Sequence, residues 1–156
     1  MSRPAVEAYA KGAGYVREAI AGLGPEDFRA VPVAGTWSIG QIVIHLMDSD
    51  LIASDRMKRV IAEENPTLIG FDESAFGRNL FYEKQDPQVA AEIFRMNREL
   101  TAVILRNLPE AAFGRAGMHN ERGRLTLGEL VDLYVAHVNH HLGFIRHKRQ
   151  LLGKPL

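Results

Sequence analysis

The spacing of hydrophobic and polar residues predicts an all-helical chain. In four long segments apolar residues recur every three or four positions, which is the period of an amphipathic helix. We predict helices over about 5–21, from Ser38 to the Asn65-Pro66 pair, over about 87–107, and from Thr126 to Leu152. No segment shows a strong strand pattern. The fold class that these features favour is all-α, a four-helix bundle.

The ends of these segments carry helix-start signals. Ser38-Ile39-Gly40-Gln41 and Thr126-Leu127-Gly128-Glu129 match capping boxes, in which the first residue and the fourth satisfy each other's free backbone N–H groups. Asp86 followed by Pro87 matches an N-cap with proline at the first helical position. Three of the four starts are therefore defined by local chemistry, and Gly153 and Pro155 stop the last helix.

The helical period also predicts which residues face inward. For the first helix they are Val6, Tyr9, Ala13, Val16 and Ile20; for the second Ile39, Ile42, Val43, Leu46, Ala53, Met57 and Val60; for the third Val89, Ile93, Met96, Leu100, Val103 and Ile104. Glycines at 12 and 14 weaken the first helix, so we expect a neighbour to pack closely against it there.

Two connections are long. Residues 65–86 show neither period but contain four aromatic residues, so we expect an irregular segment that covers the bundle. Residues 109–125 contain three glycines and are predicted to form a loop or a short hairpin. Periodicity does not decide between a simple up-and-down bundle and one with a crossover.

Composition narrows the class of protein. The 156 residues suit one domain, 1–156, and 19 basic residues balance 19 acidic ones, which argues against a nucleic-acid partner. We find no transmembrane or signal segment, so we expect a cytoplasmic protein with no membrane partner. The chain has no cysteine, which excludes disulfides and thiolate metal sites. Any metal must be held by His, Asp, Glu or backbone oxygen.

The candidate chemistry lies in the histidines. His137 and His141 are four residues apart on the inward face of the last helix, and His45 lies in the second turn of the second helix. Three imidazoles are the protein ligands of some catalytic zinc sites that keep an open position. Alternatively, each could be an ordinary hydrogen-bonded core residue. The sequence has no H-E-x-x-H and no Glu-x-x-His pair, so a mononuclear site is favoured over a dinuclear one.

Other residues are candidates for catalysis or binding. Asp48, three positions after His45, could line the site or orient a histidine, or could be solvated on the helix flank. Tyr134, one turn before His137, could donate to a substrate. His119, in the glycine-rich loop, could reach the mouth of the site, but we expect a solvated loop residue. Four loop arginines could hold an anion or could simply be solvated: Arg78, Arg115, Arg122 and Arg124.

Two strings resemble a known family. TWSIGQIVIHLMDSD (36–50) and HVNHH (137–141) resemble the DinB-like superfamily, which includes YfiT-type metal-dependent hydrolases and thiol-dependent S-transferases. The resemblance implies a DinB/YfiT-like four-helix bundle in which His45, His137 and His141 bind one divalent metal ion, zinc most often or nickel. It also implies a homodimer and, in some members, a low-molecular-weight thiol such as bacillithiol, mycothiol or glutathione.

The resemblance leaves the reaction open. It implies a metal-dependent hydrolase or thiol S-transferase acting on a small-molecule substrate. The alternative is a non-catalytic metal- or ligand-binding bundle of a stress response, and a third hypothesis is a purely structural protein. We expect an open metal site, because no acid lies at a helical spacing that obliges it to join the histidines, although Asp48, Asp72 or Glu73 could close the site.

Overall fold

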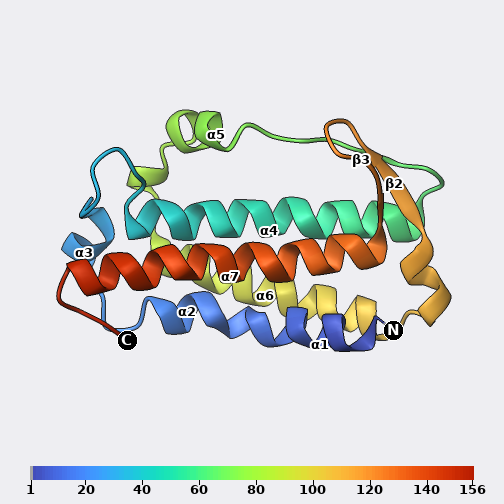
Figure 1. The fold of residues 1–156 in the computed structure, drawn as a ribbon, viewed down its shortest axis with the longest axis horizontal. Coiled ribbons are helices and arrows are strands. Elements are labelled where there is room, and N and C mark those ends of the chain that lie inside the picture. The colour runs from blue at the N-terminus through green and yellow to red at the C-terminus, as the bar shows by residue number, and fades with distance from the viewer. Residues whose placement is uncertain (1) are drawn as a thin grey trace.

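The computed structural model describes residues 2–156 and has the predicted four-helix bundle (Figure 1). The first long segment is not one regular helix but α1 (Arg3–Lys11), the 3₁₀ turn η1 (Gly12–Gly14) and α2 (Tyr15–Ala19). The other three long helices are α4 (Ile39–Ala62), α6 (Pro87–Arg106) and α7 (Leu127–Leu151). Their bounds lie within a few residues of the predicted ones.

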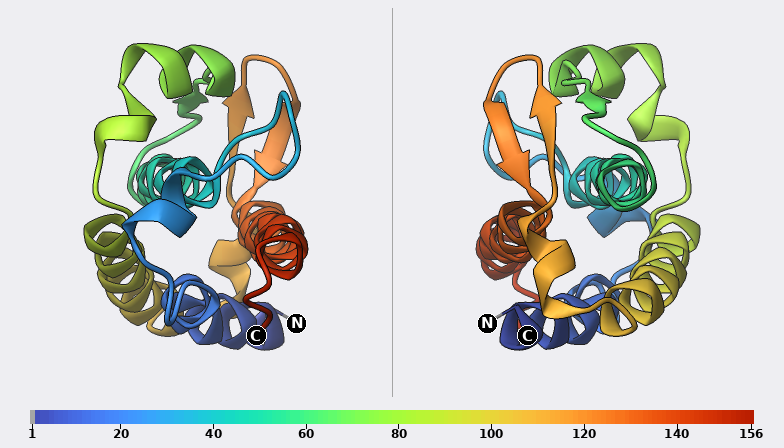
Figure 2. Two further views of the ribbon diagram at one scale, coloured as in Figure 1. Left: turned by 90° about the vertical axis from the view of Figure 1, so that its left-hand side faces the viewer. Right: turned by 90° about the vertical axis from the view of Figure 1, so that its right-hand side faces the viewer.

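The bundle contains a crossover. End-on, α4, α6, the α1–α2 segment and α7 occupy the four corners in that order (Figure 2). The chain leaves the end of α4 and returns along the length of the bundle before α6 begins, so α4 and α6 run parallel (Figure 1). The hydrophobic period of a helix could not predict this parallel arrangement, because the period does not say in which direction the helix runs relative to its neighbours.

The prediction of an irregular segment at 65–86 was wrong. This connection contains β1 (Thr67–Leu68), α5 (Glu73–Asn79) and the 3₁₀ turn η2 (Tyr82–Lys84). Each element is too short to show a period. The segment does cover the bundle, with α5 lying over α4 (Figure 2).

The other connections also carry short elements. α3 (Pro25–Arg29) precedes α4, and η3 (Glu110–Gly114) precedes a hairpin of β2 (Ala116–His119) and β3 (Gly123–Thr126). The hairpin alternative for 109–125 is therefore confirmed. β1 pairs in parallel with β2, with Thr67 opposite Met118, so the small sheet ties the crossover to the hairpin.

The predicted helix starts are confirmed. Ser38 Oγ accepts from Gln41 N at 3.2 Å while Gln41 Oε1 accepts from Ser38 N at 2.9 Å. Thr126 and Glu129 form the same reciprocal pair, and Asp86 Oδ1 accepts from Gln88 N. These caps fix where α4, α6 and α7 begin, and so fix the rotational position of the histidines on α4 and α7.

The predicted inward face of the third helix was wrong. Four of its members, Val89, Met96, Leu100 and Val103, are 47–71% exposed. The buried face of α6 consists instead of Ala90, Ala91, Phe94, Arg98, Thr101, Ala102 and Leu105. Small side chains let α6 approach its neighbours closely, and a charged residue occupies the centre of the face, which a search for large apolar residues misses.

Arg98 joins all four corners of the bundle. Its Nε donates to Asp50 Oδ1 of α4 at 2.7 Å, and its Nη2 donates to the Tyr134 carbonyl of α7 at 2.8 Å. The guanidinium carbon lies 4.4 Å from the Tyr9 ring centroid on α1. A Cβ at Gly12 would lie 2.7 Å from Arg98 Nη1, so the expected close approach at the glycines is confirmed at Gly12.

Within residues 2–156, none of the helices has the length and apolar character needed to cross a bilayer.

Candidate metal centre

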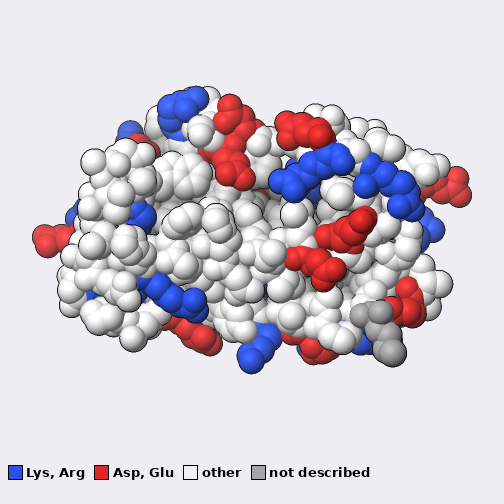
Figure 3. Space-filling view, viewed as in Figure 1, with Lys and Arg blue, Asp and Glu red and all other residues white. Residues whose placement is uncertain are grey.

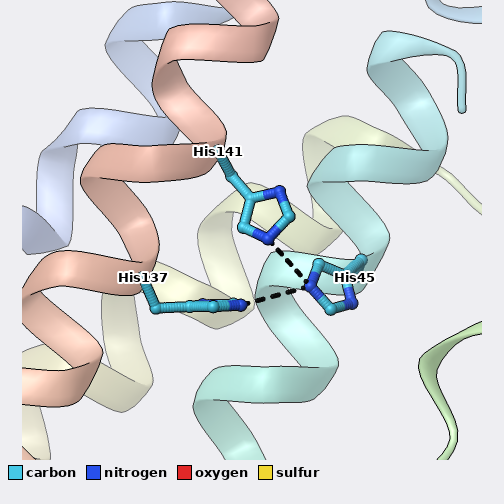
Figure 4. A group of neighbouring side chains, drawn as sticks. All are labelled: His45, His137 and His141. Atoms are coloured by element: carbon cyan, nitrogen blue, oxygen red, sulfur yellow. Dashed lines mark hydrogen bonds between the residues drawn. The ribbon is translucent and has the colours of Figure 1, made fainter. Parts of the chain in front are cut away.

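The three predicted histidines meet inside the bundle. His45 Nε2 lies 3.3 Å from His137 Nε2 and 3.2 Å from His141 Nε2 (Figure 4). His45 comes from α4, whereas His137 and His141 lie one turn apart on the facing side of α7. The Nε2 atoms of all three rings face a common point.

The surroundings keep the three rings neutral. Burial, with the neighbouring histidines adding to it, lowers the pKa of His45 to about 3. Burial likewise lowers the pKa of His137 to about 3 and that of His141 to about 4. An imidazole must be neutral to bind a metal ion, so the site holds its nitrogens in the form that coordination needs.

The arrangement fits a metal ion better than a set of hydrogen bonds. A neutral imidazole has one N–H, so three Nε2 atoms facing one another cannot all be satisfied by donation among themselves. Two nitrogens on a tetrahedral zinc ion, with bonds of about 2.0–2.1 Å, lie about 3.3 Å apart. The observed separations of 3.3 and 3.2 Å match that value.

A cavity of about 130 Å³ opens beside His137. Glu73, at the start of α5, lines it and places Oε2 4.0 Å from His45 Nε2. Burial raises the pKa of the Glu73 carboxyl, and Arg122 opposes this shift. Half of the side chain is exposed, so the carboxylate is free to move relative to the imidazoles. Of the three acids that could close the site, Glu73 is the one near the nitrogens.

Tyr134 lines the same cavity. Its hydroxyl oxygen accepts a 2.6 Å hydrogen bond from Arg56 Nη1, so the hydroxyl proton can be donated elsewhere. Arg56 is itself buried; its Nη2 also donates to the Ile69 carbonyl. Burial raises the pKa of Tyr134, which keeps it protonated as a donor.

Asp48 and Asp72 are held by other groups. Asp48 Oδ2 accepts from the Tyr82 hydroxyl at 2.7 Å, and Asp72 Oδ1 caps α5 through Ala75 N at 2.9 Å. Among the described residues, neither carboxylate makes a hydrogen bond or ion pair with one of the three histidines. Asp48 is half-buried and fixes the crossover to α4, a role that neither sequence interpretation proposed.

The expectation that His119 is solvated was wrong, and the alternative that it reaches the mouth of the site is the one that the structure supports. It is 4% exposed, lines the cavity beside His137, and its Nδ1 accepts from Glu121 N. Of the four loop arginines, Arg122 lines this cavity. Arg115 instead donates to the Val60 and Glu63 carbonyls at the end of α4.

The sequence did not single out Arg56, and it left open whether Glu73 and His119 reach the site. A signal was present for Arg56, which lies eleven residues after His45 and therefore three turns along the same face of α4. Glu73 lies in the crossover and His119 in the hairpin, and the spacing of residues along the helices does not predict where these two connections lie.

The class of protein that these features define is a crossover four-helix bundle in which two helices bring together three imidazoles, one buried and two half-buried. The chain belongs to the DinB superfamily, whose family model matches residues 8–145.

Similar proteins come from bacteria. The chain is 29% identical over 113 residues to a protein named "Putative metal-dependent hydrolase" from Oceanobacillus iheyensis, covering 72% of this chain and 64% of that protein, slightly under two thirds. The structure of YfiT from Bacillus subtilis, described as having "an unusual four-helix bundle topology", matches with a TM-score of 0.90 and 23% identity over 97% of this chain and 87% of that one.

A more distant likeness is to a mycothiol-dependent maleylpyruvate isomerase. Its structure matches with a TM-score of 0.72 and 12% identity, over 92% of this chain and 60% of that one. At this identity the likeness shows a shared fold.

Proposed function

We propose that this protein is a metal-dependent hydrolase that activates water at a divalent ion, zinc or otherwise nickel, held by His45, His137 and His141. The observation that carries the proposal is the convergence of three neutral Nε2 atoms beside a cavity. The name of the Oceanobacillus relative supports the same reaction class. When bound, a divalent ion on three imidazoles lowers the pKa of a water or thiol toward neutrality.

The residues around the cavity have roles that fit hydrolysis. Glu73 is placed to accept a proton from the attacking nucleophile, and its raised pKa brings its basicity closer to the working pH. Tyr134, oriented by Arg56, is placed to donate to an oxygen of the substrate. The crossover segment, with Phe71 and Glu73 in the cavity wall, limits the access of bulk water.

Thiol transfer is the second candidate. A second cavity, of about 360 Å³, lies on the His141 side, so two cavities flank the three histidines and offer separate places for a thiol and an electrophile. The likeness to the mycothiol-dependent isomerase supports a low-molecular-weight thiol as the cofactor. Glu73 would then take the thiol proton instead of the water proton.

Replacing Glu73 tests the catalytic role separately from metal binding. For Glu73→Gln we expect metal content equal to wild type but turnover lowered about 100-fold or more, as for loss of a general base. The matched control is Glu64→Gln, an exposed acid beyond the end of α4. Turnover is measured with ester and amide substrates, and with electrophiles plus a panel of thiols.

The outcomes separate the candidates. Turnover of esters or amides without thiol supports hydrolysis, and turnover only with a thiol supports transfer. Glu73→Gln turning over like wild type contradicts the role of Glu73. Wild-type protein that holds its ion but converts nothing across both panels favours the non-catalytic binding bundle.

A further inference from the structure

The cavity on the His141 side has the dimensions of a small-molecule site. It measures about 360 Å³, within the range of ligand pockets. Its walls come from the segment before α4, from the first turn of α4 and from the C-terminal half of α7. In Figure 3 the left-hand part of the face, where this half of α7 lies, is mostly uncharged. Apolar side chains dominate the lining: Val33, Trp37, Ile42 and Phe144.

A buried ammonium group lies in this apolar wall. Lys148 is only 4% exposed, and its Nζ donates to Thr36 Oγ1 at 2.5 Å, with Thr36 also lining the cavity. Among residues 2–156 no carboxylate lies within ion-pair distance of it, and Thr36 is its one hydrogen-bond partner. A buried charge without a counter-ion is costly, so a bound anion would be strongly favoured at this point.

The cavity connects the ammonium to the metal centre. His141 and Lys148 both line it, and they are seven residues apart on α7. Seven residues are two helical turns, or about 10 Å along the helix. The Trp37 ring lies against His45, with centroids 5.0 Å apart, so the far end of the cavity adjoins the histidine cluster. A molecule lying in the cavity would have one end at Lys148 and the other beside His141.

We propose that this cavity binds an elongated apolar carboxylic acid, with its carboxylate on Lys148 and its apolar body between Trp37 and Phe144. The acid's far end then lies beside His141. The claim that this ligand is the substrate rests on the proposed function, whereas the claim that it binds in this cavity does not.

The probe is 4-phenylbutyrate, compared with its uncharged amide. The chain contains one tryptophan, Trp37, so quenching of its fluorescence reports binding in this cavity directly. We expect the acid to bind wild type at least tenfold more tightly than the amide. In Lys148→Met the preference should fall to about one, while Lys58→Met, at an exposed position on α4, should keep it.

Metal-loaded and chelator-stripped proteins are both titrated, because the acid could instead bind the ion. A preference that disappears on stripping but survives Lys148→Met places the carboxylate on the ion and overturns the proposal. Equal binding of acid and amide by wild type overturns it as well, and this comparison requires no variant to fold.

The result is independent of the reaction. If no substrate is turned over but the acid preference depends on Lys148, the binding site stands and the proposed hydrolase fails. If turnover is found but the acid preference is absent, the hydrolase stands and this site fails.

Discussion

At the residue scale, the three histidines are the central feature. Each sits where burial disfavours its charged form, and each directs Nε2 at the other two. Metal-free protein must keep these rings neutral at the expense of stability in acid. A metal ion bound by the three Nε2 atoms would give each of these facing nitrogens a partner.

The first prediction concerns acid. The folded-state pKa values of about 3, 3 and 4 lie below the ordinary value of 6.5, so the unfolded chain takes up protons that the folded chain refuses. The stability of metal-free protein is therefore fully present above pH 6.5 and falls as the pH drops. The expected slope is about 1.4 kcal/mol per pH unit for each histidine.

Urea unfolding between pH 7.5 and 5 measures this slope, above the range in which most carboxylates titrate. His137→Asn should flatten it, whereas His147→Asn, at an exposed position further along α7, should leave it unchanged. A metal-free protein equally stable at both pH values would contradict the lowered pKa values. Metal affinity should stay nearly constant over this range, because the folded rings remain neutral, and should fall only as the pH approaches about 4.

At the scale of elements, the Asp50–Arg98 pair holds the helices in register. Both residues are buried, and the pair connects α4 and α6 directly while Arg98 also contacts α1 and α7. The pair lies next to Tyr134, whose carbonyl accepts from Arg98, so it also positions the stretch of α7 that carries His137 and His141.

The second prediction compares two arginines on α6. Arg98→Ala leaves Asp50 buried without its cation and should lower the free energy of unfolding by about 3–5 kcal/mol. Arg95→Ala removes only surface pairs with Glu92 and Glu99 and should cost less than about 1 kcal/mol. Chemical denaturation measures both, and equal losses would contradict the central role of Arg98.

The extent to which the sequence predicts these elements follows from their length. Long helices repeat their pattern several times, and the caps at Ser38, Asp86 and Thr126 are local, so three helix starts and the histidine faces follow from the sequence. The helix α5 has seven residues and β1 two, too few for a period. The buried face of α6 is unpredictable from hydrophobicity alone because Arg98 and small alanines occupy it.

At the scale of the whole molecule, the crossover decides the chemistry of the site. It brings Glu73 to within 4.0 Å of His45 Nε2 and ties to the hairpin that carries His119. These contacts are non-local, so no spacing along the sequence reveals them. The convergence of the three histidines is predictable from two helices, but the positions of Glu73 and His119 near them are not.

The third prediction is the homodimer that the family resemblance implies. The exposed apolar residues of α6 form a stripe, Val89, Met96, Leu100 and Val103, that a second copy could cover. We expect a dimer by light scattering at micromolar concentration and a monomer for Leu100→Glu. A wild-type monomer across that range would contradict the prediction.

The measurement that tests the central claim most directly is metal stoichiometry by elemental analysis of untagged protein. Wild type, and the control His140→Ala, should each hold about one zinc or nickel ion per chain after removal of loosely bound metal. His45→Ala, His137→Ala and His141→Ala should each lose most of that ion while remaining folded by circular dichroism. Wild type that binds neither metal, or single variants that keep a full equivalent, would contradict the three-histidine centre.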